Sequence, residues 1–410
     1  MKRTTEFIHT MIFIFLALIP AVSCKNELWP VTDLDASTGG DNSSRPVSTS
    51  TRTITIPGAD STASFVMIDV HLTGAGNTDE IILGEDLIEV PYRTTVKQFS
   101  LARYETSYNT WYAVLKWAKD KGYTIVKTGR EGEYGAVGSQ TAMNTGAPIF
   151  VEMPVCGITW RDAMVWCNAL SEMCGRTPVY YTDANFKTPI RNSTGPDSKE
   201  LSDYLIQPGQ VDNPYVNKDA DGFRLAYREE WEYAARKKKD GGFISGRNVS
   251  GDDSGAMFSP TAIDKMNGIS FHVSKIYTNY LWCWRNSGSG SPKTASGYDD
   301  STAILQKKNS SINGLRTHLS GGKLPNHLGF YDMSGNVPEW CFDYNTTYGS
   351  TNKFHTMRSY KGGDQVNASY EGNPVHCSGN TGGQLVRECG GFRIAQNIPK
   401  NNSSSELGKN

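Results

Sequence analysis

The chain lacks an excess of charge of either sign. Its 410 residues carry 41 Lys and Arg against 42 Asp and Glu, which gives a formal net charge of −1. A surface that binds nucleic acid needs clustered positive charge, so this balance leaves no electrostatic footprint for DNA or RNA and we expect no nucleic-acid partner. The hydrophobic share of 38% is large enough to build a core, which excludes a chain that is disordered throughout.

Long glycine-free runs with helical periodicity are also missing. With 41 Gly and 18 Pro, the sequence is rich in turns, and this excludes helical bundles and coiled coils. The cysteines form no CxxC pair and no Cys/His cluster at zinc spacing, so we expect no structural metal held by thiolates. Seven cysteines follow Cys24, and because this number is odd, at least one thiol stays free or pairs between chains. The sequence leaves their pairing open.

Residues 1–23 resemble a cleaved export signal. Lys2 and Arg3 precede the apolar run at residues 11–20, which is too short to span a bilayer and ends in small residues. The stretch Ala21-Val22-Ser23-Cys24 resembles a bacterial lipobox, in which the cysteine becomes the lipidated first residue of the mature chain. An ordinary secretory signal with an incidental cysteine is the alternative. We expect export to a bacterial cell envelope, where a lipid on Cys24 is the only membrane contact and holds the protein on the outer membrane or cell surface.

Polar segments of low complexity flank one expected domain. Residues 24–53 should form a flexible tether behind the lipidated cysteine, and residues 399–410 should form a disordered tail. No second linker of this kind interrupts residues 54–398, so we predict a single domain there. Short strands and long polar loops around a few helices indicate the α+β class with little regular secondary structure.

Three helices are predicted from apolar spacing and from capping residues. Their expected ranges are Asn109–Gly122, Thr159–Gly175 and Arg228–Lys238. The first two begin at a capping residue and stop at a glycine. The third ends in the basic run 236–239, which we expect to be solvated because a helix C-terminus favours cations.

Four sequence blocks, in family order, resemble the formylglycine-generating (sulfatase-modifying factor) family. They are Thr159-Trp160-Arg161-Asp162-Ala163, Phe223-Arg224-Leu225 followed by Glu230-Trp231-Glu232-Tyr233-Ala234-Ala235-Arg236, the run from Pro325 to Cys341 with Gly335-Asn336-Val337-Pro338-Glu339-Trp340 at its centre, and Gly391-Phe392-Arg393. The resemblance covers most of residues 65–395. It implies a formylglycine-generating-enzyme fold, which is a variant of the C-type lectin fold.

The resemblance implies oxidase chemistry only where a pair of cysteines is present. Active family members convert a target cysteine to formylglycine with O₂, using two cysteines five residues apart that bind Cu(I), a soft ion suited to thiolates. Here the matching positions are Asn367 and Gly372, and neither supplies a thiolate, while Cys377 and Cys389 lie outside the motif. We expect no copper and no formylglycine-generating activity. The alternative is an oxidase or a related oxygenase that works with displaced cysteines.

A structural calcium ion is also implied by the resemblance. Asp332, Gly335, Val337 and Glu339 match the positions where the family binds Ca²⁺ through two carboxylates and two backbone carbonyls. Oxygen ligands of this kind suit a hard cation. The alternative is that these residues only shape a turn, with the carboxylates bonded to backbone N–H groups.

The segment 360–393 keeps the family pattern at both flanks but not in between. Its interior is rich in Asn, Ser, Tyr, Asp and Gly, which is typical of a binding loop on a fixed scaffold. This layout resembles the variable proteins of diversity-generating retroelements, which display a randomised region on the same fold, and drift in an inactive paralogue is the alternative. The candidate contact residues are Asp364, Gln365, Asn367, Ser369, Tyr370, Glu371, Asn373 and His376.

A second polar segment, the insertion at residues 289–316, separates blocks that lie close together in ordinary family members. A loop of this length is typical of function rather than connection, and a standard interface needs more area than the segment 360–393 offers alone. We therefore predict a non-catalytic protein that binds a protein or glycan ligand. The sequence does not name that ligand or the oligomeric state, and a monomer is compatible with it.

Overall fold

The computed structural model describes twelve stretches of the chain. They are residues 45–85, 89–132, 144–195, 207–245, 248–254, 263–266, 269–272, 276–283, 287, 317–344, 358–363 and 390–398. Cys24, the insertion 289–316 and the tail 399–410 therefore lie outside the described residues. None of the helices in the described stretches has the length and the apolar run needed to cross a membrane.

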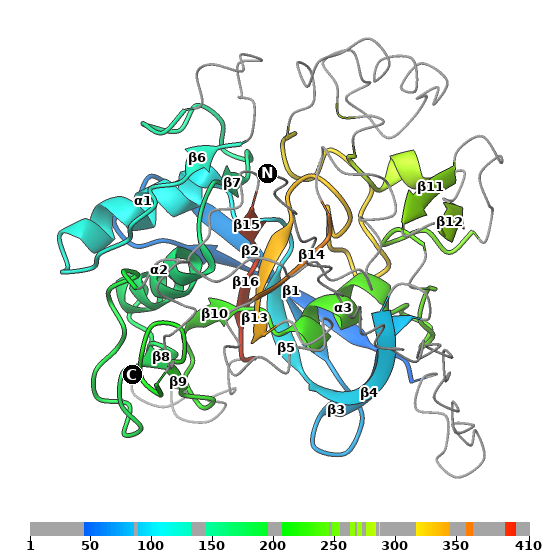
Figure 1. Ribbon diagram of the computed structural model, residues 1–410, viewed down its shortest axis with the longest axis horizontal. Coiled ribbons are helices and arrows are strands. Elements are labelled where there is room, and N and C mark those ends of the chain that lie inside the picture. The colour runs from blue at the N-terminus through cyan, green and yellow to red at the C-terminus, as the bar shows by residue number, and fades with distance from the viewer. Residues whose placement is uncertain are drawn as a thin grey trace, which may run out of the picture. The chain divides into compact units, whose positions relative to one another are not determined.

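A five-stranded antiparallel sheet forms the centre of the fold, in the strand order β1-β2-β5-β16-β10 (Figure 1). Its strands are β1 (Ser48–Thr55), β2 (Ser64–His71), β5 (Phe99–Ala102), β16 (Ile394–Gln396) and β10 (Phe223–Leu225). The last strand of the chain, β16, lies between β5 and β10. The two ends of the domain are therefore held together by the central sheet.

Strand β1 corrects the predicted start of the domain. It pairs with β2 along its whole length, from Ser48 opposite His71 to Thr55 opposite Ser64. The expectation of a flexible tether over all of residues 24–53 was therefore wrong for its last part. Ser and Thr gave this stretch the composition of a linker, but β-branched Thr also suits an edge strand whose outer face meets water.

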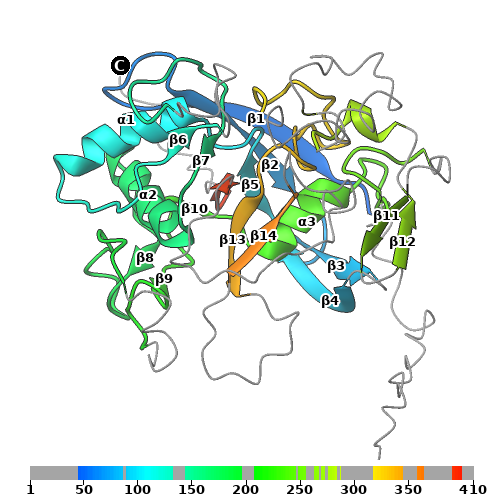
Figure 2. The same cartoon turned by 45° about the horizontal axis from the view of Figure 1, so that its top comes forward.

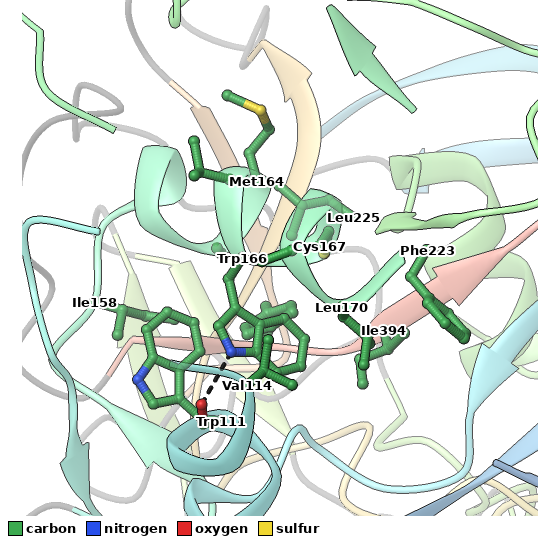
Figure 3. Packing of buried hydrophobic residues seen from close by; sticks show 14 of the residues in the cluster. Trp111, Val114, Ile158, Met164, Trp166, Cys167, Leu170, Phe223, Leu225 and Ile394 are labelled. Atoms are coloured by element: carbon green, nitrogen blue, oxygen red, sulfur yellow. Dashed lines mark hydrogen bonds between the residues drawn. The ribbon is translucent and has the colours of Figure 1, made fainter. Parts of the chain in front are cut away.

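Helices α1 (Tyr108–Lys119) and α2 (Trp160–Met173) pack on one face of the central sheet, as both views show (Figures 1 and 2). The sheet side chains Met67 and Ile394 point to this face, whereas their neighbours Ile68 and Ala395 belong to the core on the other face. The indole N–H of Trp166 donates to the backbone oxygen of Trp111 at 3.0 Å in the middle of this core (Figure 3).

The capping predictions were right for α2 and wrong by two residues for α1. Thr159 caps α2, and the Asp162 carboxylate accepts a hydrogen bond from the backbone N–H of Thr159, which completes a capping box. In α1 the cap is Ser107, whose hydroxyl accepts from the backbone N–H of Thr110. The earlier cap replaces Asn109 because serine here satisfies one of the free N–H groups of the first turn.

Helix α3 (Arg228–Arg236) packs on the opposite face with the hairpin of β3 (Thr78–Glu85) and β4 (Glu89–Lys97). The expectation that the basic run at its end would be solvated was wrong for two of its residues. Lys237 pairs with Asp79 at 2.9 Å, and both side chains are buried. Arg236 pairs with Glu232 at 2.7 Å. The hairpin covers this helix end, so the cations are held by carboxylates instead of water.

A smaller three-stranded sheet lies beside the central one, in the order β14-β13-β15. Its strands are β13 (Glu339–Tyr344), β14 (Arg358–Lys361) and β15 (Gly391–Phe392). The remaining elements are the short pairs β6 (Arg130–Glu131) with β7 (Val155–Cys156), β8 (Tyr180–Tyr181) with β9 (Tyr215–Val216) and β11 (Ile263–Met266) with β12 (Ile269–His272), and the turn η3 (Tyr277–Asn279). The predicted α+β class with little regular structure is confirmed.

Candidate functional site

The small sheet fixes both ends of the predicted ligand segment. β14 leads into this segment and β15 closes it, and both strands pair with β13, one antiparallel and the other parallel. Because paired strands lie about 4.8 Å apart, the two ends of the segment are about 10 Å apart across β13. The eight predicted contact residues lie outside the described residues; they are Asp364, Gln365, Asn367, Ser369, Tyr370, Glu371, Asn373 and His376.

Two buried ion pairs hold these ends in place. Lys361, the last residue of β14, places its ammonium 2.9 Å from the Glu232 carboxylate of α3, and neither side chain is exposed. Burial by itself would raise the pKa of Glu232, but Lys361 and Arg236 outweigh it and hold that pKa below its ordinary value. Arg393, which follows β15, pairs with Glu339 of β13 at 2.6 Å. We call β14 with Lys361, and β15 with Arg393, the two stems of the segment. Both stems are therefore held to the core by buried ion pairs.

Glu339, a predicted calcium ligand, is bound by side-chain donors. Arg393 donates from Nε to Oε2 at 3.0 Å and from Nη2 to Oε1 at 2.6 Å. The indole N–H of Trp231 in α3 also donates to Oε2, at 2.7 Å. These donors leave a carboxylate with few free lone pairs, so any cation here shares Glu339 with Arg393.

Asp332 presents an open oxygen in the same region. It is 2% exposed, and its Oδ2 accepts from the backbone N–H of Gly321 at 2.6 Å. Its Oδ1 is buried and has no hydrogen-bond partner in the described part of the chain. Burial raises the pKa of Asp332 to about 6, against the lowering effect of the Gly321 N–H and Arg393. An unsatisfied buried oxygen is costly unless a donor or a cation reaches it.

The loop that carries Asp332 turns sharply into β13. Asp332, Gly335 and Asn336 have φ values of 54°, 78° and 62°, in the left-handed region. A side chain at position 335 would place its Cβ 2.0 Å from the backbone oxygen of Trp282, so only glycine fits. The stretch between Asp332 and the start of β13 contains Gly335 and Val337, the other two members of the predicted ligand set.

Glu105 lies near Asp332 and Glu339, and the sequence motifs did not indicate it. We call these three carboxylates the acidic group. The Glu105 carboxylate accepts from the side chains of Asn336 at 2.7 Å and Ser320 at 2.8 Å, and from the backbone N–H of Val337 at 3.1 Å. Burial, and after it Asp332 and Glu339, raise the pKa of Glu105 well above its usual range. The one signal in the sequence is an acid three residues after the end of the apolar strand β5. Nothing local predicts that it reaches Asn336.

The acidic group can accommodate a cation only with the help of backbone oxygens. No three His, Cys, Asp or Glu side chains come together as a metal site within the described stretches. The open Oδ1 of Asp332, the excess of negative charge and the tight turn at Gly335 do fit a calcium ion held by two carboxylates and two carbonyls. The bound ion would supply charge neutralisation and would crosslink the turn to β13.

The thiols in the described part of the chain do not resemble a copper site. The five cysteines there are mostly buried; they are Cys156, Cys167, Cys174, Cys283 and Cys341. Burial raises the pKa of the Cys167 thiol, and it raises that of Cys174 to about 11. Since the thiolate is the form that binds metal, these shifts disfavour copper at both positions. Cys377 and Cys389 lie outside the described residues.

Comparison with protein families gives a match over almost the whole domain. The model of the sulfatase-modifying factor enzyme 1-like domain matches residues 40–398. A curated relative, the chaperone protein LppX of Paenibacillus barcinonensis, is 30% identical over 217 residues, which is 53% of this chain. The chain spans only 60% of the length of that relative.

Solved structures share the fold at low sequence identity. The variable protein 1 of Treponema denticola aligns with a TM-score of 0.51 and 19% identity, over 85% of this chain and 99% of its own. The crystal structure of CarF aligns with a TM-score of 0.48 and 21% identity, over 78% and 96% of the two chains. The first of these likenesses and the family match confirm the predicted formylglycine-generating-enzyme variant of the C-type lectin fold.

Proposed function

This chain belongs to the family of the sulfatase-modifying factor enzyme 1-like domain, and we propose that it uses the family fold to bind a ligand without the oxidase reaction. One feature of the sequence supports the proposal. By the resemblance to the family, Asn367 and Gly372 match the positions of the two cysteines that the oxidase needs. A side-chain amide and a glycine offer no thiolate, so they do not bind Cu(I) in the way that the reaction requires.

The ligand is bound by the polar segment between the two stems. Its candidate contacts are the eight residues from Asp364 to His376, helped by the insertion 289–316. The pairs Lys361–Glu232 and Arg393–Glu339 support this role, because a binding loop gains affinity when its supports are rigid and little ordering is needed on binding.

The ligand is a protein or a glycan, and nucleic acid is not expected. Short polar side chains and Tyr suit both kinds of surface, because they combine adaptable hydrogen bonds with rigid contact area. The curated relative LppX is named as a chaperone protein, and this supports the choice of a protein ligand. A monomer is sufficient for this role.

A lipid on Cys24 anchors the protein to the bacterial cell envelope, at the outer membrane or cell surface. The apolar run at residues 11–20 and the Ala21-Val22-Ser23-Cys24 sequence support this placement. The tether between the anchor and the domain is shorter than residues 24–53, because β1 begins at Ser48. Radiolabelled fatty acid should label the wild type and should not label Cys24→Ser.

A calcium ion bound in the acidic group stabilises the stems. Asp332 and Glu339 supply carboxylate oxygens, and Gly335 and Val337 supply backbone carbonyls. The open Oδ1 of Asp332 supports this assignment. The ion has no part in chemistry and serves to neutralise the acidic group and to hold the turn.

The lack of oxidase activity can be tested directly. Mature protein is incubated with Cu(I) and a sulfatase-type Cys peptide, and the peptide is examined by mass spectrometry for the aldehyde. A matched peptide with Ser in place of Cys reports background oxidation. We expect no aldehyde above that background. Turnover would overturn the proposal and would support an oxidase with displaced cysteines.

A further inference from the structure

A cavity of about 960 Å³ lies at the N-terminus of α3. Its walls come from the loop before β3 and the end of β4, from the loop between β9 and β10, from the first turn of α3, from the end of β13 and from the residues after β16. The labels of β10, β13, α3 and β4 mark these elements across the lower middle of Figure 1. This volume is at the upper end of the range of small-molecule sites. None of the residues that line the cavity belongs to the segment 364–389 or to the acidic group at Asp332.

The inner wall of the cavity is acidic. It contains Glu229, Glu230 and Asp343, against one cation, Arg224, so its formal charge is −3 + 1 = −2. Arg224 donates to both oxygens of Glu230 at 2.6 and 2.7 Å, and also to the side chain of Asn397. Glu229 and Asp343 therefore carry the net charge of this wall.

The rim of the cavity adds no net charge. Lys97 and Lys218 lie there with Asp219 and Asp221, and all four are exposed.

The backbone N–H of Arg228 donates to Asp343 Oδ2 at 2.6 Å, which caps α3. The guanidinium of Arg228 itself lies over the Tyr92 ring, 5.4 Å from its centroid.

We propose that this cavity binds a ligand through a positively charged nitrogen group, a guanidinium or an ammonium, which contacts Glu229 and Asp343. Charge-assisted hydrogen bonds to two carboxylates are among the stronger polar contacts, and a planar guanidinium matches carboxylate geometry. The apolar side chains of Val179, Val216 and Ile398 in the same wall suit the alkyl part of such a ligand.

The electrostatics of the two carboxylates support a cation as the occupant. Burial, followed by the charges of Asp343 and Glu230, raises the pKa of Glu229 to about 7, with Arg224 opposing. Burial and the charge of Glu230 also raise the pKa of Asp343, against the lowering effects of backbone N–H donors and of the Arg228 charge. A raised pKa means that the charged carboxylate is disfavoured in the unliganded cavity, and a cation placed near both groups favours their ionised forms.

Isothermal titration calorimetry on the mature protein tests this site. The probes are agmatine, a free cation, and the peptide Gly-Gly-Arg-Gly-Gly, which presents the same group as a protein side chain. The matched neutral probe carries citrulline in place of Arg. We expect binding of agmatine if the natural ligand is a free small molecule, and stronger binding of the peptide if it is a protein.

Binding should weaken about tenfold from pH 8 to pH 6, because a carboxyl group with a pKa of about 7 is ionised in roughly one molecule in ten at pH 6. Binding near pH 7 should release protons, which buffers of different ionisation enthalpy reveal. Glu229→Gln should lose both the affinity and the proton release. Asp343→Asn should lose affinity while it keeps an acceptor for the Arg228 N–H. Glu80→Gln, in an exposed pair on β3, should change neither.

The inference is overturned if no cationic probe binds at millimolar concentration, if citrulline binds as well as Arg, or if folded Glu229→Gln binds like the wild type. It is independent of the proposed function. Loss of the partner of the 364–376 segment would leave this cavity intact, and Glu229→Gln should leave that partner bound.

Discussion

At the scale of single residues, a buried ion pair fixes one end of the ligand segment. Arg393 and Glu339 are 0% and 1% exposed, and they tie the residue after β15 to the first residue of β13. Removing one partner of such a pair leaves the other charge in the interior without compensation. An exposed pair such as Arg93 with Glu80 loses much less, because water replaces the partner.

Arg393→Met should lower the free energy of unfolding by about 3–5 kcal/mol, since it strands the Glu339 carboxylate. Arg93→Met, the matched control, should change it by less than about 1 kcal/mol. Urea titration followed by circular dichroism measures both. Equal effects from the two variants would show that the buried pair does not hold the stem.

Gly335 and Gly175 allow a second comparison at this scale. Both have positive φ, but a Cβ at 335 would lie 2.0 Å from Trp282 O, whereas a Cβ at 175 meets nothing within 4 Å. Gly175→Ala should cost only the strain of the left-handed conformation, about 1 kcal/mol. Gly335→Ala should cost several kcal/mol or prevent folding. Similar melting temperatures for the two variants would contradict the described turn.

At the scale of elements, the predictions that succeeded rest on local signals. Helix α2 carries its own capping box at Thr159 and Asp162, so its start is written in neighbouring residues. The strand β1 is defined by its pairing with β2, and the burial of Lys237 is defined by the hairpin that carries Asp79. Partners that come from elsewhere in the chain leave no periodic or capping signal.

The same distinction applies to the candidate site. The motif around Gly335 and Glu339 could be found because its residues are consecutive. Glu105, which bonds to Asn336 across most of the chain, could not be found. The cavity at α3 also has no sequence signature, because its walls come from several separate parts of the chain.

The first turn of α3 should make stability depend on pH. The pKa of Glu229 is raised to about 7 from an ordinary value of 4.5 by burial and by Asp343 and Glu230. Between these values the folded chain keeps a proton that the unfolded chain releases, so the contribution of this group to stability falls as the pH rises from about 4.5 to 7. Below and above that window it is constant.

Glu229→Gln has no proton to lose, so its stability relative to the wild type should rise over this window, by on the order of 1 kcal/mol or more. Chemical denaturation at pH 5 and pH 8 measures the difference. Glu80→Gln is the control on an exposed carboxyl group of β3. A constant difference between wild type and Glu229→Gln at both pH values would contradict the raised pKa.

At the scale of the whole molecule, we propose two separate binding sites on one fold, the segment 364–389 and the cavity at α3. The central sheet closes the chain through β16, and the small sheet presents both ends of the segment 364–389 on either side of β13. The core therefore fixes the residues on both sides of the segment, and in our proposal the side chains of the segment determine the ligand. Because the core and the proposed ligand segment are separate parts of the chain, the family fold can persist without the cysteine pair.

Calcium should stabilise the molecule as a whole if the acidic group binds it. Addition of Ca²⁺ after chelation should raise the melting temperature, and a concentration of one hundred times the Kd corresponds to about 2.7 kcal/mol. Asp332→Ala should abolish the rise, whereas Glu80→Ala should keep it. An unchanged melting temperature of the wild type at millimolar Ca²⁺ would show that the acidic group does not bind calcium.

The most direct test of the central claim compares ligand capture by three folded forms of the mature protein. They are the wild type, a variant with the eight candidate residues between Asp364 and His376 changed to Ala, and Glu229→Gln. Each is offered a glycan panel and the proteins of the cell exterior, and retained ligands are quantified by mass spectrometry or fluorescence. The account predicts a partner that the wild type and Glu229→Gln retain and the segment variant loses. If the segment variant retains every partner of the wild type, the segment is not the binding site.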